Sequence, residues 1–364
     1  MTVAVPDSPR PRGVLERMPR YRPGLPPAPV PGLAAYKISS NENPYPPLPS
    51  VLEVVREHAA GINRYPDMGN TALRDAIVER LRVSADMIAP GTGSVGVLGQ
   101  IVVAMCDAGD EVVYAWRSFE AYPIVVALAG AEAVAVPLTA DHRHDLAAMA
   151  AAITDRTRVV LVCTPNNPTG TIVTDAEIRD FLTTVPAHVL VVIDEAYVEF
   201  VTEPDAPDSL AILRDHPNVV VLRTFSKAYG LAGLRVGYAV AHPEIAEALR
   251  MTATPFGVNV LAQAAAVASL AAYDELDVRV KELVAERGRV EEALADQGWD
   301  LPPSQANFVW FPLGEDTPAF AAACEEQALT VRPYAVDGVR ATIGEPEASD
   351  RLLQIAAAWR AARG

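Results

Sequence analysis

Short β-rich runs alternate with helical stretches through the middle of the chain, and this alternation constrains the fold more than any other feature. The runs are rich in valine and other apolar residues and occupy 111–115, 133–136, 159–163, 189–193, 219–222 and 236–240. Helical periodicity covers 71–82, and another helix is expected to begin at Ser94. Strands that alternate with helices form a mostly parallel sheet with helices on both faces. The sequence therefore predicts an α/β domain.

The regions on either side of this domain have a different character. Residues 1–35 are rich in proline and lack periodicity, which predicts an N-terminal arm that is either disordered or laid over a partner surface. A long helical stretch at 263–297 is followed by an apolar run at 308–311, a helix and a run at 339–343. We expect a large domain at 66–255 and a small α+β domain made of 36–65 and 256–364.

Charge and composition exclude several classes of function. The 364 residues carry a formal net charge of −16, which opposes nucleic acid as a partner because a phosphate backbone would be repelled. No run of about 18 or more apolar residues is present, and the N-terminus lacks the apolar core of a secretory signal. Cys106, Cys163 and Cys324 are far apart and have no metal-ligand spacing. We therefore expect a cytoplasmic protein with reduced thiols, no metal site and no membrane or nucleic-acid partner.

Two loops after predicted strands have the composition of ligand-binding turns. In Gly91-Thr92-Gly93-Ser94, the glycines allow close approach of an anion, and a following helix would offer free N–H groups. A plain tight turn is the alternative. The loop at 164–170, Thr-Pro-Asn-Asn-Pro-Thr-Gly, follows a strand at the edge where ligands bind in parallel sheets. Its prolines and glycine would fix the direction of Asn167, although an ordinary Asn-Pro turn is possible.

An acidic residue ends another buried run. The sequence Val191-Val192-Ile193-Asp194 leads a strand into a carboxylate, followed three residues later by Tyr197. A buried carboxylate needs a cationic or N–H partner, and a pyridinium nitrogen is such a partner. Tyr197 would then be placed to donate a hydrogen bond to a phenolate oxygen of the same ring.

The most specific string is Thr-Phe-Ser-Lys-Ala-Tyr-Gly-Leu-Ala-Gly-Leu-Arg at 224–235. Lysine is seldom buried without a chemical reason, and covalent attachment of a cofactor as a Schiff base gives Lys227 such a reason. Arg235, with the hydroxyl groups of Thr224 and Ser226, suits a phosphate dianion. A surface lysine in a glycine-rich loop is the alternative.

Together these strings resemble fold-type I pyridoxal-phosphate enzymes, class II aminotransferases, in the histidinol-phosphate aminotransferase subgroup. The resemblance covers about residues 20–360. Further marks are Ser-Asn-Glu-Asn-Pro-Tyr at 40–45, Asn-Arg-Tyr-Pro at 63–66 and Asn-Phe-Val at 307–309. It implies a large domain with a mostly parallel seven-stranded sheet between helices, plus a smaller α+β domain. It also implies that the cofactor is pyridoxal 5′-phosphate.

The resemblance implies a role for each residue of the cofactor site. Lys227 would carry the cofactor and move the proton between the substrate Cα and the cofactor C4′, and Asp194 would pair with the pyridinium nitrogen. Hydrogen bonds to the phenolate oxygen are implied for Tyr197 and Asn167. Phe119 fits the aromatic residue that stacks on the ring, with a core aromatic as the alternative. The implied phosphate ligands are Gly93, Ser94, Thr224, Ser226 and Arg235.

Substrate and subunit contacts follow from the same resemblance. Arg340 fits the arginine that binds the substrate α-carboxylate, and Arg332 faces the same pocket unless it is a solvated surface arginine. Tyr21, Asn43 and Asn167 resemble residues that contact the substrate. Tyr65 is similar to a tyrosine that reaches the cofactor phosphate of the neighbouring subunit, which implies a homodimer.

The choice of amino donor depends on local strings. Many histidinol-phosphate enzymes have an acidic pair where this chain has Val95-Gly96. The strings at 116–119, 303–310 and 331–334 resemble actinobacterial aromatic (phenylalanine) aminotransferases. We expect an aromatic amino acid donor and 2-oxoglutarate as acceptor, in a two-half-reaction ping-pong cycle. The alternative is histidinol phosphate as donor, and more remote alternatives are a decarboxylase and a non-enzymatic regulator of the same fold.

Overall fold

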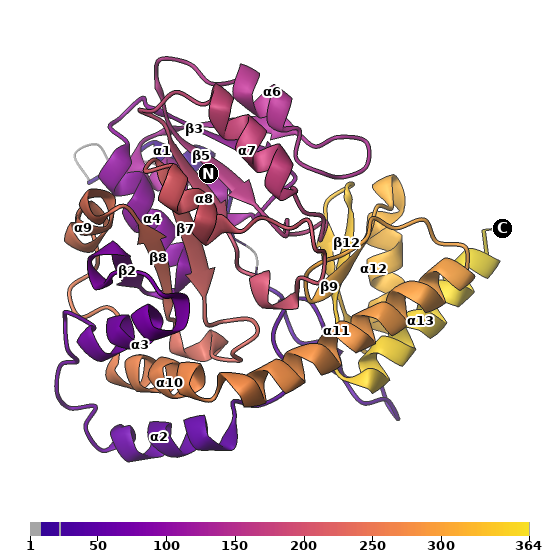
Figure 1. Cartoon of the computed structure of the whole chain (residues 1–364). Helices are drawn as coiled ribbons and strands as arrows, with labels where there is room; N and C mark the ends of the chain where they lie inside the picture. Colours follow the sequence, from indigo (N-terminus) through magenta and orange to yellow (C-terminus); the bar gives the residue numbers. More distant parts are fainter. Residues whose placement is uncertain (1–8, 22, 364) are drawn as a thin grey trace.

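The computed structural model describes residues 9–21 and 23–363, and within them the central feature is a seven-stranded sheet (Figure 1). The strand order is β2-β8-β7-β6-β5-β3-β4, and β8 runs antiparallel to both β2 and β7 while the other pairs are parallel. The bounds are β2 Ile88–Gly91, β3 Glu111–Trp116, β4 Glu132–Pro137, β5 Thr157–Cys163, β6 Leu190–Asp194, β7 Val219–Thr224 and β8 Gly237–Ala241. The expected mostly parallel sheet of an α/β fold is confirmed.

Strand β2 lies where a strand was expected before the turn at Gly91–Ser94, but it is not one of the six apolar runs identified in the sequence. It has four residues and includes Pro90, which lacks an N–H group for the ladder. Proline is tolerated at the edge of a sheet, and β2 lies at an edge, paired only with β8. The other six strands begin and end within two residues of the predicted runs.

Alternate side chains of the central strands enter two separate hydrophobic clusters. In β5, Val160 and Val162 belong to one cluster, and Val159 and Leu161 belong to the other. Successive side chains of a strand point to opposite faces, so both faces of this sheet are covered. Helices α3, α6, α7, α8 and α10 supply buried residues to the first cluster, and α4, α5 and α9 to the second.

Helices α4 to α8 connect successive strands of the large sheet, α2 and α3 precede β2, and α9 and α10 follow β8. Their bounds are α2 Pro49–Ala59, α3 Thr71–Leu81, α4 Gly93–Met105, α5 Ala121–Ala129, α6 Leu146–Ala151, α7 Asp175–Thr184, α8 Ser209–Asp215, α9 Pro243–Met251 and α10 Val260–Ala271. Short 3₁₀ turns are η1 Ala85–Met87, η2 Val198–Phe200 and η3 Ala232–Leu234. Helix α4 begins at Gly93, where φ is +76°, directly after the turn that the sequence marked.

The C-terminal region forms a second unit with its own core. An antiparallel sheet of order β11-β12-β9 (Arg332–Tyr334, Gly338–Thr342, Phe308–Phe311) packs with α12 (Thr317–Glu326) and α13 (Pro346–Ala361). Strand β1 (Tyr36–Lys37) pairs with β10 (Leu329–Thr330) beside it, and η4 (Gly314–Asp316) precedes α12. This is the expected smaller α+β unit.

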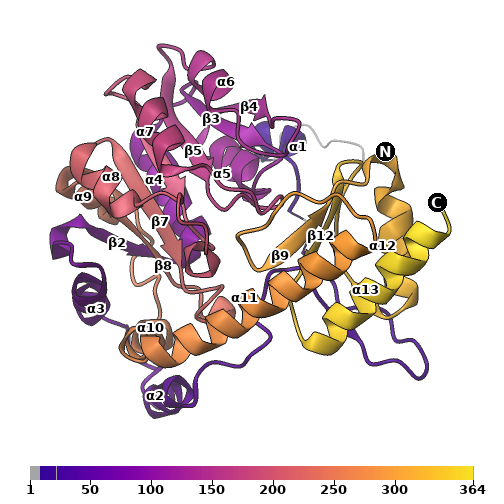
Figure 2. The same ribbon diagram turned by 45° about the vertical axis from the view of Figure 1, so that its right-hand side comes forward.

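A long helix joins the two units (Figure 2). Instead of one helix over 263–297, the structure has α10 and then α11 (Tyr273–Asp296), interrupted at Ala272, where neither glycine nor proline marks the break. The first half of α11 buries Leu276 and Leu283 in a cluster with the large sheet, and its second half buries Val290 and Leu294 in the small-unit core.

The packing also bears on the expected domain boundaries at residues 65 and 255. Val51 of α2 and Ala262 of α10 lie in the same hydrophobic cluster as residues of the large sheet, although the expected boundaries place both helices in the small domain. We therefore propose a boundary within α11. Of the expected arm, residues 1–8 and 22 lie outside the described residues. Its helix α1 (Val14–Arg17) lies next to Arg12, which donates a hydrogen bond to the carbonyl of Leu128.

No helix in the described ranges is both long enough and apolar enough to span a bilayer.

Candidate active site

A cavity of about 310 Å³ lies between the carboxyl ends of the large-sheet strands and the small sheet. Asp194 and Thr224 are the last residues of β6 and β7, and Asn167 lies in the loop after β5. Arg332 and Arg340 reach the cavity from β11 and β12 of the small sheet. The carboxyl ends of parallel strands are where ligands bind in such folds. The cavity therefore combines residues that the sequence places more than 170 positions apart.

Lys227 lines this cavity three residues after the end of β7. Its Nζ donates a hydrogen bond to the carbonyl oxygen of Ser40, at 3.2 Å. Burial, followed by the positive charge of Arg340, lowers the pKa of the Lys227 amine to about 7. A neutral amine is a nucleophile and a base, and a pKa of about 7 makes a large fraction of this lysine neutral near neutral pH.

Asp194 is buried and holds one oxygen without a partner. Its Oδ2 accepts a hydrogen bond from the hydroxyl of Tyr122 at 2.8 Å, whereas Oδ1 has no hydrogen-bond partner among the described residues. Burial raises the pKa of the Asp194 carboxyl to about 6, and the bond from Tyr122 opposes that rise. A cationic N–H group in the cavity would satisfy Oδ1 and stabilise the carboxylate.

Tyr197 and Asn167 lie on the same side of the cavity and are both held by hydrogen bonds. The Tyr197 hydroxyl accepts from Nδ2 of Asn41, at 2.8 Å. The Asn167 Oδ1 accepts from Nη1 of Arg340. Because the arginine occupies the carbonyl end of Asn167, the amide N–H end of that side chain is available to a bound group.

The residues expected to hold a phosphate gather at the start of α4. Ser94, Thr224, Ser226 and Arg235 line the cavity, and Arg235 Nη1 donates to the Ser226 hydroxyl at 3.2 Å. Gly93 lies behind them. A Cβ at this position would come within 2.3 Å of Arg235 Nη2, so only glycine allows the guanidinium to approach the helix start. A helix N-terminus with hydroxyl and guanidinium donors suits a phosphate dianion.

These features fit pyridoxal 5′-phosphate on separate grounds. The unpartnered Asp194 Oδ1 suits a protonated ring nitrogen, the neutral amine of Lys227 suits covalent attachment, and the donors around Arg235 suit the phosphate. Phe119 also lines the cavity, and its ring centroid lies 5.7 Å from that of Tyr122. An aromatic face is therefore available beside the expected position of the ring.

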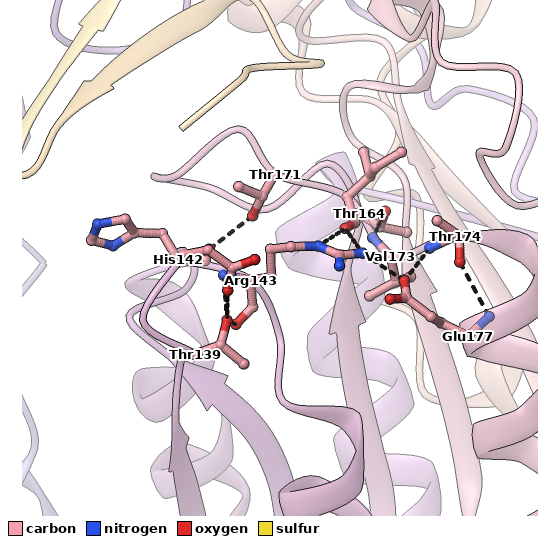
Figure 3. A network of polar contacts seen from close by, with 10 residues as sticks. Thr139, His142, Arg143, Thr164, Thr171, Val173, Thr174 and Glu177 are labelled. Atoms are coloured by element: carbon pink, nitrogen blue, oxygen red, sulfur yellow. Dashed lines mark hydrogen bonds and ion pairs between the residues drawn. The ribbon is translucent and has the colours of Figure 1, made fainter. Parts of the chain in front are cut away.

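A polar network fixes the loop that carries Asn167 (Figure 3). Arg143 donates to the carbonyl of Ile172 at 3.2 and 3.1 Å and pairs with Glu177 at 2.6 Å, and Thr171 donates to the carbonyl of His142 at 2.8 Å. Thr174 caps α7 through a reciprocal pair of bonds with Glu177. The loop is thus attached to both the segment after β4 and the first turn of α7.

A second set of bonds joins the Asn167 loop to the segment before α5. Ser118 donates to Oδ1 of Asn166 at 2.7 Å, and Asn166 Nδ2 donates to Thr169 at 2.9 Å. Ser118 and Asn166 are adjacent in the chain to Phe119 and Asn167, so the bond fixes the two cavity residues relative to each other.

Arg340 and Arg332 both lie on the small-sheet side of the cavity. Arg340 donates to the carbonyl of Ser39 at 2.6 Å and to the Tyr334 hydroxyl at 3.0 Å, and its Nε has no partner in the described part of the chain. Arg332 pairs with Glu120, with Nη2 and Oε2 2.6 Å apart. Neither arginine is a solvated surface residue, since both are buried.

Tyr21 lines the cavity from the N-terminal arm, but two other expected contacts lie elsewhere. Asn43 donates to the carbonyl of Ala228 at 2.8 Å, so it supports the Lys227 segment from outside the cavity. Tyr65 is 82% exposed and stacks on Phe256, with ring centroids 4.6 Å apart. Its position leaves it free to contact another molecule.

Several residues of the site were not identified from the sequence. Tyr122 bonds to Asp194 from the first turn of α5, and Asn41 bonds to Tyr197. Glu120 and Tyr334 line the cavity beside the two arginines. Asn41 and Tyr334 lie within strings that carried the resemblance, which was the available signal for them. Nothing in the local sequence connects Tyr122 or Glu120 to residues more than 70 positions away.

Comparison with known proteins agrees with this geometry. Residues 35–355 match the sequence family described as Aminotransferase class I and II. The chain therefore belongs to this family of pyridoxal-phosphate-dependent aminotransferases. It is 58% identical to the aromatic amino acid aminotransferase of Streptomyces coelicolor, over 97% of this chain and 98% of that protein.

Other relatives and solved structures support the same family. Identity to the aromatic amino acid aminotransferase of Streptomyces avermitilis is 59%, over 97% of this chain and 98% of that protein. The crystal structure of histidinol-phosphate aminotransferase from Sinorhizobium meliloti with pyridoxal 5′-phosphate matches with a TM-score of 0.83 and 32% identity. That match covers 91% of this chain and 92% of the other.

Proposed function

We propose that this aminotransferase moves the amino group of phenylalanine and related aromatic amino acids to 2-oxoglutarate. The observation that carries the choice of donor is the 58–59% identity, over nearly the whole chain, to aromatic amino acid aminotransferases. The solved histidinol-phosphate enzyme is similar in structure but is 32% identical. The free thiols of Cys106, Cys163 and Cys324 support a cytoplasmic enzyme, and we assign it to amino-acid biosynthesis.

The cavity residues divide the binding of the cofactor between them. When bound, pyridoxal 5′-phosphate supplies an electron sink that stabilises negative charge at the substrate Cα. Asp194 holds the positive charge on the ring nitrogen, and Phe119 covers a face of the ring. Tyr197 and Asn167 donate hydrogen bonds to the ring oxygen. Gly93, Ser94, Thr224, Ser226 and Arg235 hold the phosphate.

Arg340 and Lys227 act on the substrate. Arg340 binds the α-carboxylate, for which its unpartnered Nε and its position above the cavity are suited. Lys227 is the residue that would hold the cofactor covalently, and its amine is the base of the site. As a base with a lowered pKa, this amine would move the proton between the substrate Cα and the cofactor C4′. The acceptor then uses the same residues in reverse order.

The test of the donor is a comparison of kcat/KM for phenylalanine and histidinol phosphate, with 2-oxoglutarate as acceptor in both assays. We expect phenylalanine to be preferred by at least about tenfold, since pockets built for one side chain commonly discriminate by one to two orders of magnitude. A preference for histidinol phosphate would reject the proposed donor and leave the family assignment intact. Carbon dioxide release from either donor would indicate a decarboxylase.

We further propose a homodimer in which Tyr65 completes the site of the partner. Tyr65 and Phe256 form an exposed aromatic pair, and exposed Met68 and Met251 lie beside it around an apolar hollow of about 600 Å³. Exposed apolar patches of this kind mark protein–protein contacts. The hollow also reaches the start of α4, beside the expected phosphate position, so a second copy seated there would lie close to the site.

Subunit complementation tests this arrangement. A Lys227→Ala chain and a Tyr65→Ala chain are each expected to have low activity, but their mixed dimer should contain one intact site. That site has its own Lys227 and receives Tyr65 from the other subunit. Recovery of about a quarter of wild-type activity after random mixing supports Tyr65 acting across the interface, since half of the dimers are mixed and each has one site. No recovery in mixed dimers shown to form would reject it.

A further inference from the structure

The charges of the cavity are unevenly compensated. The arginines that line it in the described part of the chain are Arg235, Arg332 and Arg340. Arg235 faces the phosphate position and Arg340 faces the α-carboxylate position, and neither is paired with a carboxylate among the described residues. Arg332 differs because Glu120 accepts hydrogen bonds from its Nε and Nη2, at 3.2 and 2.6 Å. Arg235 and Arg340 are therefore available for the cofactor phosphate and the substrate α-carboxylate, whereas the charge of Arg332 is neutralised by Glu120.

The ion pair between Glu120 and Arg332 connects the two units across the cavity. Glu120 directly follows Phe119 at the start of α5, and Arg332 is the first residue of β11 in the small sheet. The Arg332 side chain is 11% exposed and that of Glu120 is 28% exposed. Burial lowers the pKa of the Arg332 guanidinium, but the bond to Glu120 more than offsets this and raises it overall. Arg332 is therefore a charged group in a partly desolvated site, and its Nε and Nη2 donors are occupied by Glu120.

Aromatic rings surround this pair. The Arg332 Cζ lies 5.7 Å from the centroid of the Tyr334 ring and 6.0 Å from that of Tyr21, and both tyrosines line the cavity. A neutral aromatic side chain can pack against such a wall without requiring a further charge. Histidinol phosphate carries its phosphate where an amino acid carries the α-carboxylate, and Arg332 lies opposite Arg340 on the neighbouring strand. A phosphate at this position would compete with Glu120 for Arg332 and would be repelled by the Glu120 carboxylate.

We propose that Glu120 is a specificity-determining residue that disfavours donors with a phosphate in place of the α-carboxylate, by occupying Arg332. This inference rests on the proposed function, because it explains how the same cavity favours the α-carboxylate of an amino acid over the phosphate of histidinol phosphate. Glu120 does not take part in proton transfer, and it acts on the choice of substrate through Arg332. The effect is greatest for a phosphate dianion and smaller for a single carboxylate, since the repulsion scales with charge.

Glu120→Gln removes the negative charge with little change in shape. The quantity to measure is the ratio of kcat/KM values for the two donors. We expect the ratio of kcat/KM for histidinol phosphate to that for phenylalanine to rise by roughly tenfold or more, the range measured for close charge pairs. The change should lie mainly in the KM of histidinol phosphate, because the reacting atoms are unaffected. Glu120→Asp keeps the charge and should shift the ratio less than Glu120→Gln.

Two controls separate this mechanism from a general change in charge or structure. Glu42 also lines the cavity but pairs with Lys37 at 2.7 Å, so Glu42→Gln removes the same charge without releasing Arg332. Its effect on the donor ratio should be less than about threefold, as for a partly exposed pair. In an Arg332→Met background, Glu120→Gln should no longer raise the ratio.

A measurement without turnover covers the case in which a variant is poorly active. Calorimetric binding of phenyl phosphate and of 3-phenylpropionate to the holoenzyme compares a dianion with a singly charged ligand. Glu120→Gln should tighten phenyl phosphate binding relative to 3-phenylpropionate by about the same factor as the kinetic ratio. An unchanged ratio in both measurements, or an equal rise in the Arg332→Met background, overturns the proposal. The wild-type donor preference separately tests the proposed function, so the two failures are distinguishable.

Discussion

The two sides of the cavity are built in different ways. The inner wall consists of Asp194, Thr224, Lys227 and Arg235, which follow consecutive strands of the large sheet. The outer wall consists of Tyr21, Glu120, Arg332 and Tyr334, which come from the N-terminal arm, the start of α5 and the small sheet. Under the proposed function, the inner wall would hold the groups that carry out the reaction, and the outer wall would hold those that select the substrate. Reaction type and substrate choice are therefore encoded in separate parts of the molecule.

The largest effect is expected for Lys227→Ala on the inner wall. The variant lacks both the attachment point for the cofactor and the base, so kcat should fall by at least about 10⁴-fold for every donor. The absorbance of the lysine-bound cofactor should also be lost. Lys281→Ala is the matched control, because Lys281 is 75% exposed and pairs only with Asp277 among the described residues. Substantial turnover by the Lys227 variant would reject the role assigned to this lysine.

Arg340→Lys tests the boundary between the two walls. Lysine keeps the charge but cannot bond simultaneously to Asn167, Tyr334 and Ser39, and it loses two-point binding of a carboxylate. We expect kcat/KM to fall roughly 100-fold both for phenylalanine and for histidinol phosphate, as for a buried charge pair. Arg351→Lys, at a half-buried arginine bonded to the carbonyls of Ala34 and Gln327, should change kcat/KM little. A loss confined to one class of donor would show that Arg340 belongs to the outer wall.

The pH dependence of cofactor capture by the apoenzyme tests the environment of Lys227. The amine attacks only when it is neutral, and burial lowers its pKa to about 7. The rate of attachment should therefore increase as pH rises through 7 and level off above it, with about a tenfold increase between pH 6 and pH 8. Stopped-flow absorbance would follow the reaction. A rate that continued to rise above pH 9 would indicate an ordinary solvated lysine.

The smallest effect is expected for Tyr122→Phe, which removes the hydrogen bond to Asp194 at 2.8 Å. A hydrogen bond of this kind contributes about 1 kcal/mol, so kcat should fall roughly fivefold for both donors. Without that donor, the pKa of the Asp194 carboxyl should rise above its value of about 6. Tyr114→Phe is the control, because Tyr114 is a buried neighbour whose ring lies 5.7 Å from that of Tyr122. Equal effects of the two substitutions would assign Tyr122 a packing role only.

The difference between the two walls also explains what could be predicted from the sequence. The inner wall was predicted because Asp194 and Thr224 lie at the ends of recognisable apolar strands, and Lys227 and Arg235 belong to the specific string that begins at Thr224. The carboxyl ends of parallel strands meet at one edge, which brings these residues together. The large sheet was predicted for the same reason, apart from β2, whose four residues include Pro90.

The outer wall could not be predicted in the same way. Glu120 and Arg332 are 212 positions apart and pair only because the small sheet packs over the start of α5. The sequence identified Arg332 but not the carboxylate that occupies it. Similarly, the break between α10 and α11 and the shared core of α2 with the large sheet depend on tertiary packing, which local periodicity does not report.

The most direct test of the separation between the walls is one experiment on two variants. Asp194→Asn should lower kcat/KM for phenylalanine and for histidinol phosphate by a similar factor, roughly 100-fold or more, leaving their ratio unchanged. Glu120→Gln should change the ratio in favour of histidinol phosphate. A changed ratio in Asp194→Asn together with an unchanged ratio in Glu120→Gln would contradict the division of the cavity into a reaction wall and a substrate wall.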